Sequence, residues 1–539
     1  MPHKRLMFHT DAREKILRGV NAIADAMRVT LGPKSKCVLI ERRWGQPIVC
    51  NDGVTIAKEF DLSDPEENLG AQILRGVAER TGEEVGDGTT TSTLLAHAMV
   101  TEGLRNITAG ASAIDVKRGL ERGVRVVVES LRRQSRPVSS QREKQQVATV
   151  SAHNDAAIGE MVARAMEQVG AEGAVTVEEA KGTETALEVV QGMQFDRGYL
   201  SPYFVTNPEK MEAVLDNALL LLYEGKIANL KDLLPLLEQI AKRGEPLVVI
   251  AEEVEGEALA TLVVNKLRGV FSTVAVKAPG YGDRRKAMLD DLAVVTGGKL
   301  IAAELGVRLE NVSVEHLGHA TRVVVDRERT TVVGGQGDPH AIEGRCRELR
   351  TQIAETTSTY DKEKLEERLA KLAGGVAVIR VGAASEAELK SRREAFDDAI
   401  HATRAAIAEG VVPGCGLPLL RAIETLDTEI AAATGDERAG LQILRRALEA
   451  PTRQIADNSG LDDGVVVDRM RTGTGAFGLD AATGQYVDLV EAGIIDPTKV
   501  VRLALENAVS AAGVLLLTEA TMTEIPEPRP PAAAPEGLS

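Results

Sequence analysis

The stretch Gly86-Asp87-Gly88-Thr89-Thr90-Thr91 holds residue types that suit phosphate chemistry. Its glycines let the backbone turn tightly and approach a ligand closely. Its threonines stand where a helix would begin, beside the unpaired N–H groups and the positive dipole end that attract anions. Asp87 would repel a bare phosphate, so its presence favours a hard cation such as Mg²⁺ between the carboxylate and the phosphate. The loop indicates a metal–nucleotide site, although a glycine turn with a Thr-rich N-cap stays open as the alternative.

The segments around this loop have the periodicity of helices that could hold it in place. Apolar residues recur on one face from Asp11 to Thr30, and Asp11 with Glu14 resembles a capping box. Helical periodicity also covers Pro65 to Arg133, interrupted by the loop and by Gly110. We therefore expect the loop to connect two long helices.

Strand-like and helical segments alternate in the middle of the chain. The predicted strands are Cys37–Ile40 and Pro47–Cys50 around a turn near Gly45, Ala174–Val177, Leu219–Tyr223, Leu247–Ile250, Val270–Val276 and Val376–Val381. Further helices are predicted over Asp155–Val169 and Glu363–Leu372, and helical periodicity dominates from Glu386 to Glu519. From Gln191 on, short strand-like segments alternate with helical ones, which indicates an inserted α/β domain. The predicted fold class is therefore multidomain α/β.

Length and composition exclude several classes of protein. A chain of 539 residues is long enough for roughly three domains, and 44% hydrophobic residues with 3% aromatic ones favour aliphatic, helix-rich cores. The net charge of −16 argues against a nucleic-acid partner. The four cysteines are irregularly spaced, which indicates neither a disulfide framework nor a zinc site. Without an apolar signal core or an uninterrupted apolar run of about 18 residues, we expect a cytoplasmic protein with no membrane segment.

Two other motifs are weaker candidates for function. Gly473 to Gly478 spells the dinucleotide fingerprint, but no helix of useful length can follow because Gly484 interrupts, so we interpret it as a glycine hairpin. His316 and His319 have the spacing of a helical metal pair, but Gly318 intervenes and no third ligand is near, so we expect surface histidines. The sequence contains no Walker loop, nucleophile elbow or H-E-x-x-H motif.

Five further stretches accompany the loop in a recognisable order: Thr30–Lys34, Asn51–Val54, Lys371–Gly375, Asp398–Ala406 and Asp496–Val500. Together they closely resemble the group I chaperonins, the GroEL-type ring chaperones, from about Phe8 to about Glu524. The resemblance implies a mainly helical equatorial ATP-binding domain at 1–136 and 411–525 and a small α/β intermediate hinge domain at 137–190 and 376–410. It also implies an inserted α/β apical domain at 191–375. The Pro/Ala-rich tail at 526–539 is expected to be disordered.

The resemblance also implies roles for individual residues. Asp52 and Asp398 match the carboxylates that activate water, and Asp87 matches the Mg²⁺ ligand, with a potassium ion expected alongside. For Asp398 the alternative is a helix N-cap, a role that Asp397 could equally serve. The remaining nucleotide-site positions are Thr30, Leu31, Gly32, Pro33, Asn51, Gly88, Thr89, Thr90, Thr91, Cys415, Asp480, Ala481, Ala482 and Asp496.

A second set of residues matches the family's polypeptide-binding surface. These are Tyr199, Tyr203, Phe204, Leu234, Leu237, Leu259, Val263 and Val264. Apolar stripes at this spacing are usually core, but the resemblance implies an exposed rim that binds non-native proteins and then a lid-type co-chaperonin. It further implies two stacked seven-membered rings, with Arg453 and Asp462 at the contact between rings.

The sequence departs from the family pattern at three site positions. Asn51 stands where the best-known member of the family has Lys, although other members carry Asn there. Asp480 replaces a frequent Asn, and Cys415 stands where a third glycine is usual. The leading hypothesis is an ATP-driven folding chaperonin. A chaperonin-shaped holdase or scaffold with weak ATPase is the alternative, whereas a metabolic kinase is disfavoured because no small-molecule pocket motif is present.

Overall fold

The computed structural model describes residues 3–524, except for 42–46, 139, 171–172, 181, 209, 303, 305–306 and 357. The chain forms two compact units, one made of Met1–Val162 with Glu394–Ser539 and the other of Ala163–Arg393. Both ends of the chain therefore contribute to one unit, and the other unit is inserted between them. The turn near Gly45 and the tail at 526–539 lie outside the described residues.

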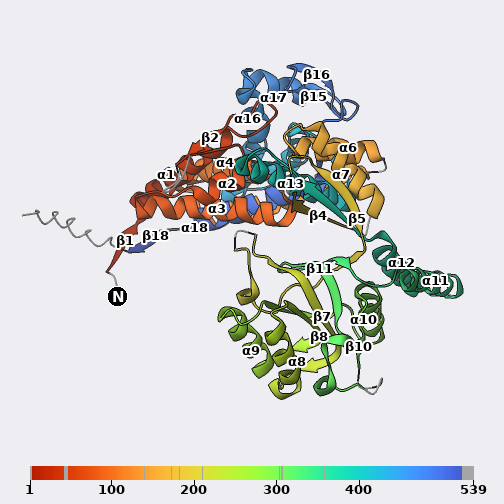
Figure 1. Ribbon diagram of the computed structural model, residues 1–539. Helices are drawn as coiled ribbons and strands as arrows, with labels where there is room; N and C mark the ends of the chain where they lie inside the picture. Colours follow the sequence, from red (N-terminus) through yellow and green to blue (C-terminus); the bar gives the residue numbers. More distant parts are fainter. Residues whose placement is uncertain are drawn as a thin grey trace, which may run out of the picture. The chain divides into compact units, whose positions relative to one another are not determined.

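Long helices dominate the first unit (Figure 1). They are α1 (His9–Arg28), α2 (Gly53–Glu59), α3 (Pro65–Val85), α4 (Thr89–Thr108), α5 (Ala113–Gln134), α6 (Gln141–Ser151), α14 (Leu417–Ala432), α15 (Gly435–Ala447), α16 (Ala450–Asn458), α17 (Asp463–Thr472) and α18 (Thr498–Leu517). The boundaries between the units fall within α7 (Ala156–Val169) and α13 (Glu386–Glu409).

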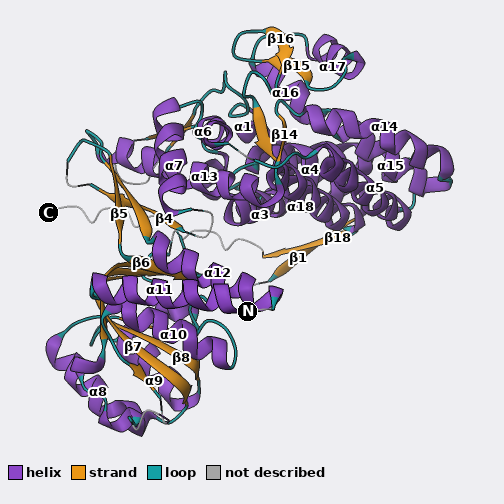
Figure 2. Cartoon of the chain, turned by 90° about the vertical axis from the view of Figure 1, so that its right-hand side faces the viewer, coloured by secondary structure: helices purple, strands orange, loops and turns teal. Residues whose placement is uncertain are grey.

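One apolar core joins the long helices of the first unit. Val20 of α1, Leu74 of α3, Leu95 of α4, Leu120 of α5 and Leu505 of α18 are fully buried in it. Figure 2 shows the bundle that α3, α4, α5, α14, α15 and α18 form. This bundle supplies the rigid support for the loops at the helix ends.

Paired strands of three to five residues close the ends of the first unit. β1 (Lys4–Phe8) pairs antiparallel with β18 (Ala520–Glu524), and β2 (Val38–Ile40) with β3 (Ile48–Cys50). The other antiparallel pairs are β14 (Val411–Pro413) with β17 (Ile495–Pro497), and β15 (Phe477–Asp480) with β16 (Gln485–Asp488).

The start of α1 differs from the prediction. The helix begins at His9, directly after β1, and its N-cap Phe8 makes no side-chain capping bond. The capping box of Asp11 with Glu14 is therefore wrong, because the pairing of β1 with β18 fixes where the strand ends and the helix begins. Asp11 instead lies in the first turn of α1, where its negative charge suits the helix dipole.

Among the described residues, α18 is the one helix long and apolar enough to cross a membrane by length and composition. Most of its residues are buried within the first unit, and it packs against α3, α4 and α5. It is accordingly a core helix of this unit.

The second unit contains a seven-stranded mixed sheet with the strand order β6-β12-β11-β7-β8-β9, in which β10 pairs with β7. Its strands are β6 (Gly192–Phe195), β7 (Ala213–Ile227), β8 (Leu247–Val254), β9 (Thr273–Lys277), β10 (Leu300–Ile301), β11 (Gly318–Val325) and β12 (Thr330–Gly335). Strands β7, β8 and β9 are parallel and are connected through α8 (Leu230–Arg243) and α9 (Gly256–Leu267). This is the α/β alternation that the sequence predicts.

The remaining elements of the second unit form a small sheet and a group of helices. β13 (Val376–Val381) lies between parallel β4 (Ala174–Glu179) and antiparallel β5 (Ala186–Val190). The helices are α10 (Asp283–Thr296), α11 (Pro339–Glu355) and α12 (Thr359–Gly374), with short 3₁₀ turns at Pro202–Phe204, Leu309–Asn311 and Val314–His316. The multidomain α/β fold class is confirmed.

Candidate nucleotide site

The predicted phosphate loop connects α3 to α4. Gly86 ends α3 with φ +70°, and Gly88 precedes α4 with φ +77°, a left-handed conformation that favours glycine at both positions. The N–H of Gly88 donates to Oδ1 of Asp87 at 2.5 Å. The N-cap residue Gly88 makes no side-chain capping bond, so the positive end of this 20-residue helix is available to an anion.

The loop threonines are tied to the end of α1. Thr89 and Thr90 are buried, whereas Thr91 is half-buried. The Thr30 hydroxyl donates to the carbonyl of Met27 at 2.8 Å, and Oγ1 of Thr90 lies 3.0 Å from Oγ1 of Thr30. Because Thr30 has already used its proton, Thr90 donates in this contact. The structure thus brings the 30–33 stretch to the phosphate loop.

Asn458 fixes the 30–33 stretch from the other side. Its Nδ2 group donates to the carbonyls of Arg28 at 2.9 Å and Leu31 at 2.8 Å. Gly32 has φ +91°, and a Cβ there would stand 3.3 Å from Ile455. Sequence reasoning did not identify Asn458, because a helix-terminal amide gives no signal of the distant carbonyls that it binds.

Asp52 also lies beside the threonines. A Cβ on Gly53 would stand 2.5 Å from Oγ1 of Thr90 and 2.8 Å from Oγ1 of Thr89, so the start of α2 packs directly against the loop. The Asp52 carboxylate caps α2 by accepting from the N–H groups of Val54 and Thr55 at 3.2 and 2.7 Å. Asn51 lies between β3 and Asp52.

Asp398 lies in the interior of α13, twelve residues after the helix begins at Glu386. The N-cap alternative for Asp398 and Asp397 is therefore wrong. Burial raises the pKa of the Asp398 carboxyl well above its ordinary value, and the negative charges of Asp52 and Asp87 raise it further. The three predicted carboxylates thus come close enough to repel one another.

The pKa of Asp87 is also raised, mainly by burial. Carboxylates that are desolvated and mutually repelled bind a cation favourably. Among the described residues, no three His, Cys, Asp or Glu side chains are gathered as a complete metal site. The donor set therefore fits a Mg²⁺ ion that takes most of its ligands from phosphate and water, as this ion commonly does.

A second group of residues lies where β14 leads into α14 (Figure 2). Strand pairing sets Asp496 opposite Val412, and the Gly414 N–H donates to the Ile494 carbonyl at 2.8 Å. Burial raises the pKa of Asp496 to about 7, with a further contribution from Asp87. The described residues provide no hydrogen bond or ion pair for this carboxylate.

Cys415 has φ +57° and so adopts the left-handed conformation that suits the glycine usual at this position. Burial raises the pKa of its thiol to about 12, and the charges of Asp496 and Asp480 add to this effect. The sulfur atom therefore lies within the electrostatic reach of the two predicted nucleotide-site aspartates. Thr452 donates to the Cys415 carbonyl at 2.9 Å and holds the turn against α16.

Asp480 ends β15 and organises the hairpin turn that follows. Its carboxylate accepts from the N–H of Ala482 at 3.0 Å and from the hydroxyl of Thr483 at 2.7 Å. Ala481 is buried and Ala482 is exposed. The Gly473–Gly478 stretch runs directly into this hairpin, and the next helix, α18, begins only at Thr498, so the stretch leads into a hairpin as predicted and not into a dinucleotide-binding helix.

The predicted polypeptide-binding residues divide by exposure. Leu234, Val264 and Tyr203 are exposed by 44%, 42% and 65%, and Tyr199, Leu259 and Val263 are partly buried. Phe204 and Leu237 lie in the core of the second unit, which corrects the expectation that they form part of an exposed rim.

The face of α8 toward the core consists of Leu233, Leu236, Leu237 and Ile240, so Leu237 is packed while Leu234 lies outside that face. Two neighbouring apolar side chains that the sequence did not single out, Leu267 and Val270, are exposed by 60% and 48%. Their only sequence signal is apolar character at and beyond the end of α9.

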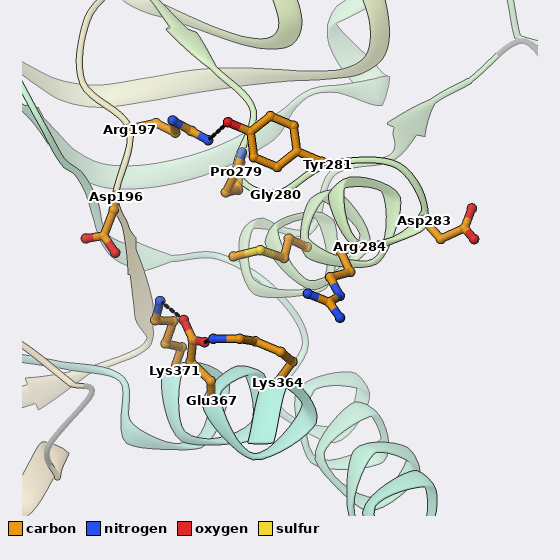
Figure 3. A pocket seen from close by; sticks show the side chains of 11 residues that line it. Asp196, Arg197, Pro279, Gly280, Tyr281, Asp283, Arg284, Lys364, Glu367 and Lys371 are labelled. Atoms are coloured by element: carbon orange, nitrogen blue, oxygen red, sulfur yellow. Dashed lines mark hydrogen bonds and ion pairs between the residues drawn. The ribbon is translucent and has the colours of Figure 1, made fainter. Parts of the chain in front are cut away.

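A polar cavity of about 520 Å³ in the second unit is separate from these residues (Figure 3). Its charged groups are partly paired within the cavity, since Glu367 accepts from Lys364 at 3.0 Å and from Lys371 at 2.8 Å. Arg197 donates to the hydroxyl of Tyr281 at 3.0 Å. The cavity contains none of the predicted nucleotide-site residues.

Other sequence expectations have clear outcomes. All four cysteines are free. His316 ends a 3₁₀ turn and His319 lies on strand β11, so they do not share a helix. Arg453 pairs with Asp463 and Glu449, each at 2.7 Å, while Asp462 caps α17. The ring contact expected of Arg453 and Asp462 stays a prediction.

Comparison with known proteins gives a consistent result. Residues 23–526 match the model of the TCP-1/cpn60 chaperonin family. The chain is also similar to the chaperonin GroEL 5 of Bradyrhizobium diazoefficiens, with 64% identity over 529 residues that cover 98% of each chain.

Proposed function

The chain belongs to the TCP-1/cpn60 chaperonin family, and from that premise we propose that this folding chaperone is driven by binding and hydrolysis of ATP. The observation that carries the proposal is the convergence of Asp52, Asp87 and Asp398 on the uncapped N-terminus of α4. A free helix N-terminus suits phosphate, and mutually repelled carboxylates beside it suit a cation bound to that phosphate.

The residues of the loop would position the substrate for attack by water. Backbone N–H groups and hydroxyls from Gly88 to Thr91 would hold the phosphates, and the 30–33 stretch would close over them. Asp87 would hold Mg²⁺, which, when bound, neutralises phosphate charge, with K⁺ alongside. Asp398 and Asp52 would accept hydrogen bonds from the attacking water and orient it. Asp480, Ala481, Ala482, Asp496 and Cys415 would face the ribose and base.

The second unit would supply the surface for client proteins. Exposed Leu234, Val264 and Tyr203, extended by Leu267 and Val270, support an apolar surface on and around α8 and α9. Such a surface would bind non-native chains through their own exposed apolar groups and would then bind a lid-type co-chaperonin. We further propose the three-domain division given above, assembly into two stacked seven-membered rings, and a cytoplasmic location.

A steady-state ATPase assay with and without an unfolded protein tests this proposal. We expect Mg²⁺-dependent hydrolysis that changes when client is added, together with refolding that requires ATP. Client binding without hydrolysis would contradict the proposal and favour the holdase alternative. The specific observation in favour of that alternative is Cys415, whose side chain stands beside the site in a backbone conformation that suits glycine.

A further inference from the structure

Helix α13 presents more than Asp398 to the phosphate loop. His401 and Ala405 follow Asp398 at i+3 and i+7, so the three residues share one face of the helix. Ala405 is buried in a small apolar cluster with Val85, the last residue of α3, and Val500 of α18. This face of α13 therefore packs where the phosphate loop begins.

His401 is packed against Gly86, the residue that precedes Asp87. A Cβ placed on Gly86 would stand 2.5 Å from Cβ of His401 and 3.1 Å from both Cγ and Nδ1. The His401 side chain and the Gly86 backbone are thus in contact, and this contact leaves no space for a larger residue at position 86. Because Gly86 also has φ +70°, two independent features favour glycine here.

The contact between His401 and Gly86 helps to hold α13 against the phosphate loop. Asp398 on α13 and Asp87 on the loop are both acidic, so their side chains offer no ion pair that could hold α13 against the loop. Packing must therefore supply that contact. His401 lies one helical turn from Asp398 and touches the neighbour of Asp87, so it forms a packed link between the elements that carry the two carboxylates.

We propose that His401 is a positioning residue, whose side chain holds α13 against Gly86 and thereby sets the spacing between Asp398 and Asp87. The inference rests on the proposed ATPase function and deepens it. The role is positional: the ring packs between helix and loop, and no proton transfer is required of it. Loss of the ring would allow Asp398 to move relative to the substrate phosphates while leaving the phosphate-binding groups in place.

The test compares His401→Ala with His401→Phe in the full-length assembled protein. Phe keeps a planar ring of similar size but cannot titrate. Thr403→Ala is the matched control, because Thr403 is buried on the same helix, lies two residues on and bonds only within α13, to the Ala399 carbonyl at 2.7 Å. For each protein, single-turnover hydrolysis at saturating Mg·ATP and the affinity for Mg·ADP are measured.

We expect His401→Ala to slow single-turnover hydrolysis about tenfold or more, because misplacing a group by about 1 Å can cost about 10²-fold. Its ADP affinity should stay within about threefold of the original protein, His401→Phe should hydrolyse faster than His401→Ala, and Thr403→Ala should hydrolyse at close to the original rate. The inference is overturned if His401→Ala is fully active, if rate and affinity fall together, if the folded Phe variant is as slow as the Ala variant, or if Thr403→Ala is equally slow. An original protein without ATPase activity would instead overturn the proposed function.

Discussion

The carboxyl group of Asp496 gives the most direct test of how the nucleotide site is tuned. Its pKa of about 7, against an ordinary value of 3.8, arises mainly from burial. A difference of this size corresponds to about 4 kcal/mol in favour of the neutral form. The folded protein without ligand therefore holds a proton on Asp496 at pH values where an exposed aspartate has lost it.

The sign of the pH dependence follows from this raised pKa. The stability contributed by the bound proton is fully present below the ordinary pKa of 3.8 and is lost as the pH rises through about 7. A ribose hydroxyl donates a stronger hydrogen bond to the ionised carboxylate of Asp496 than to the neutral carboxyl, so binding favours the ionised form. Since a group with a pKa of 7 is about one tenth ionised at pH 6 and about nine tenths at pH 8, the affinity for Mg·ADP should rise by up to about tenfold over this range.

Calorimetric titration of Mg·ADP at pH 6, 7 and 8 would measure this effect. The nucleotide phosphates and the other site carboxylates also titrate, so the relevant quantity is the difference between the original protein and Asp496→Asn. Between pH 6 and pH 8, the Mg·ADP affinity of Asp496→Asn should rise up to about tenfold less than the affinity of the original protein. The idea of a ligand-facing carboxylate at this position would be refuted if the Mg·ADP affinity changed with pH equally in the two proteins, or if it fell with rising pH in both.

Three further outcomes test the remaining assignments. Asp398→Ala should slow hydrolysis by about 10²-fold with little change in ADP affinity, and equal losses in both would contradict a role in orienting water. Leu234→Ser and Val264→Ser should abolish client capture with the basal ATPase intact, whereas Leu237→Ser should lower the melting temperature, because Leu237 is 5% exposed and Leu234 is 44% exposed. Saturating Mg·ADP should slow alkylation of Cys415 severalfold without affecting Cys346, as resolved by peptide mass mapping, and Cys415→Gly should bind nucleotide equally well or more tightly. Identical labelling of Cys415 with and without ADP would place its thiol away from the ligand.

Much of the fold follows from local pattern. The helices between Pro65 and Arg133 end at the loop and near Gly110 as predicted, and β13 covers the predicted Val376–Val381. Long periodic segments and buried strands carry their own signal because packing repeats along them. The start of α1 does not, because a strand pair that joins residues about 500 positions apart decides it.

The site was harder to predict at positions that depend on tertiary contacts. Aspartate is a frequent N-cap residue, so residue type left that role open for Asp398, whereas α13 begins twelve residues earlier and places Asp398 in the helix interior. Leu234 and Leu237 have the same residue type and nearly the same neighbours in sequence. Which of the two faces the sheet depends on how α8 docks, and no local period determines that.

Tertiary contacts also bring the three site carboxylates together. Asp52, Asp87 and Asp398 come from three separate parts of the chain, and burial together with neighbouring negative charge disfavours the charged forms of Asp87 and Asp398 in the protein without ligand. Such a cluster lowers the stability of the folded protein, because a neutral or paired residue at any of these positions would be buried at a smaller cost in folding free energy. The bundle core, Asn458 and the contact of His401 with Gly86 hold the arrangement against that cost. A bound cation and nucleotide would relieve this unfavourable interaction between the carboxylates. The free energy released in that way would contribute to the affinity for the ligand.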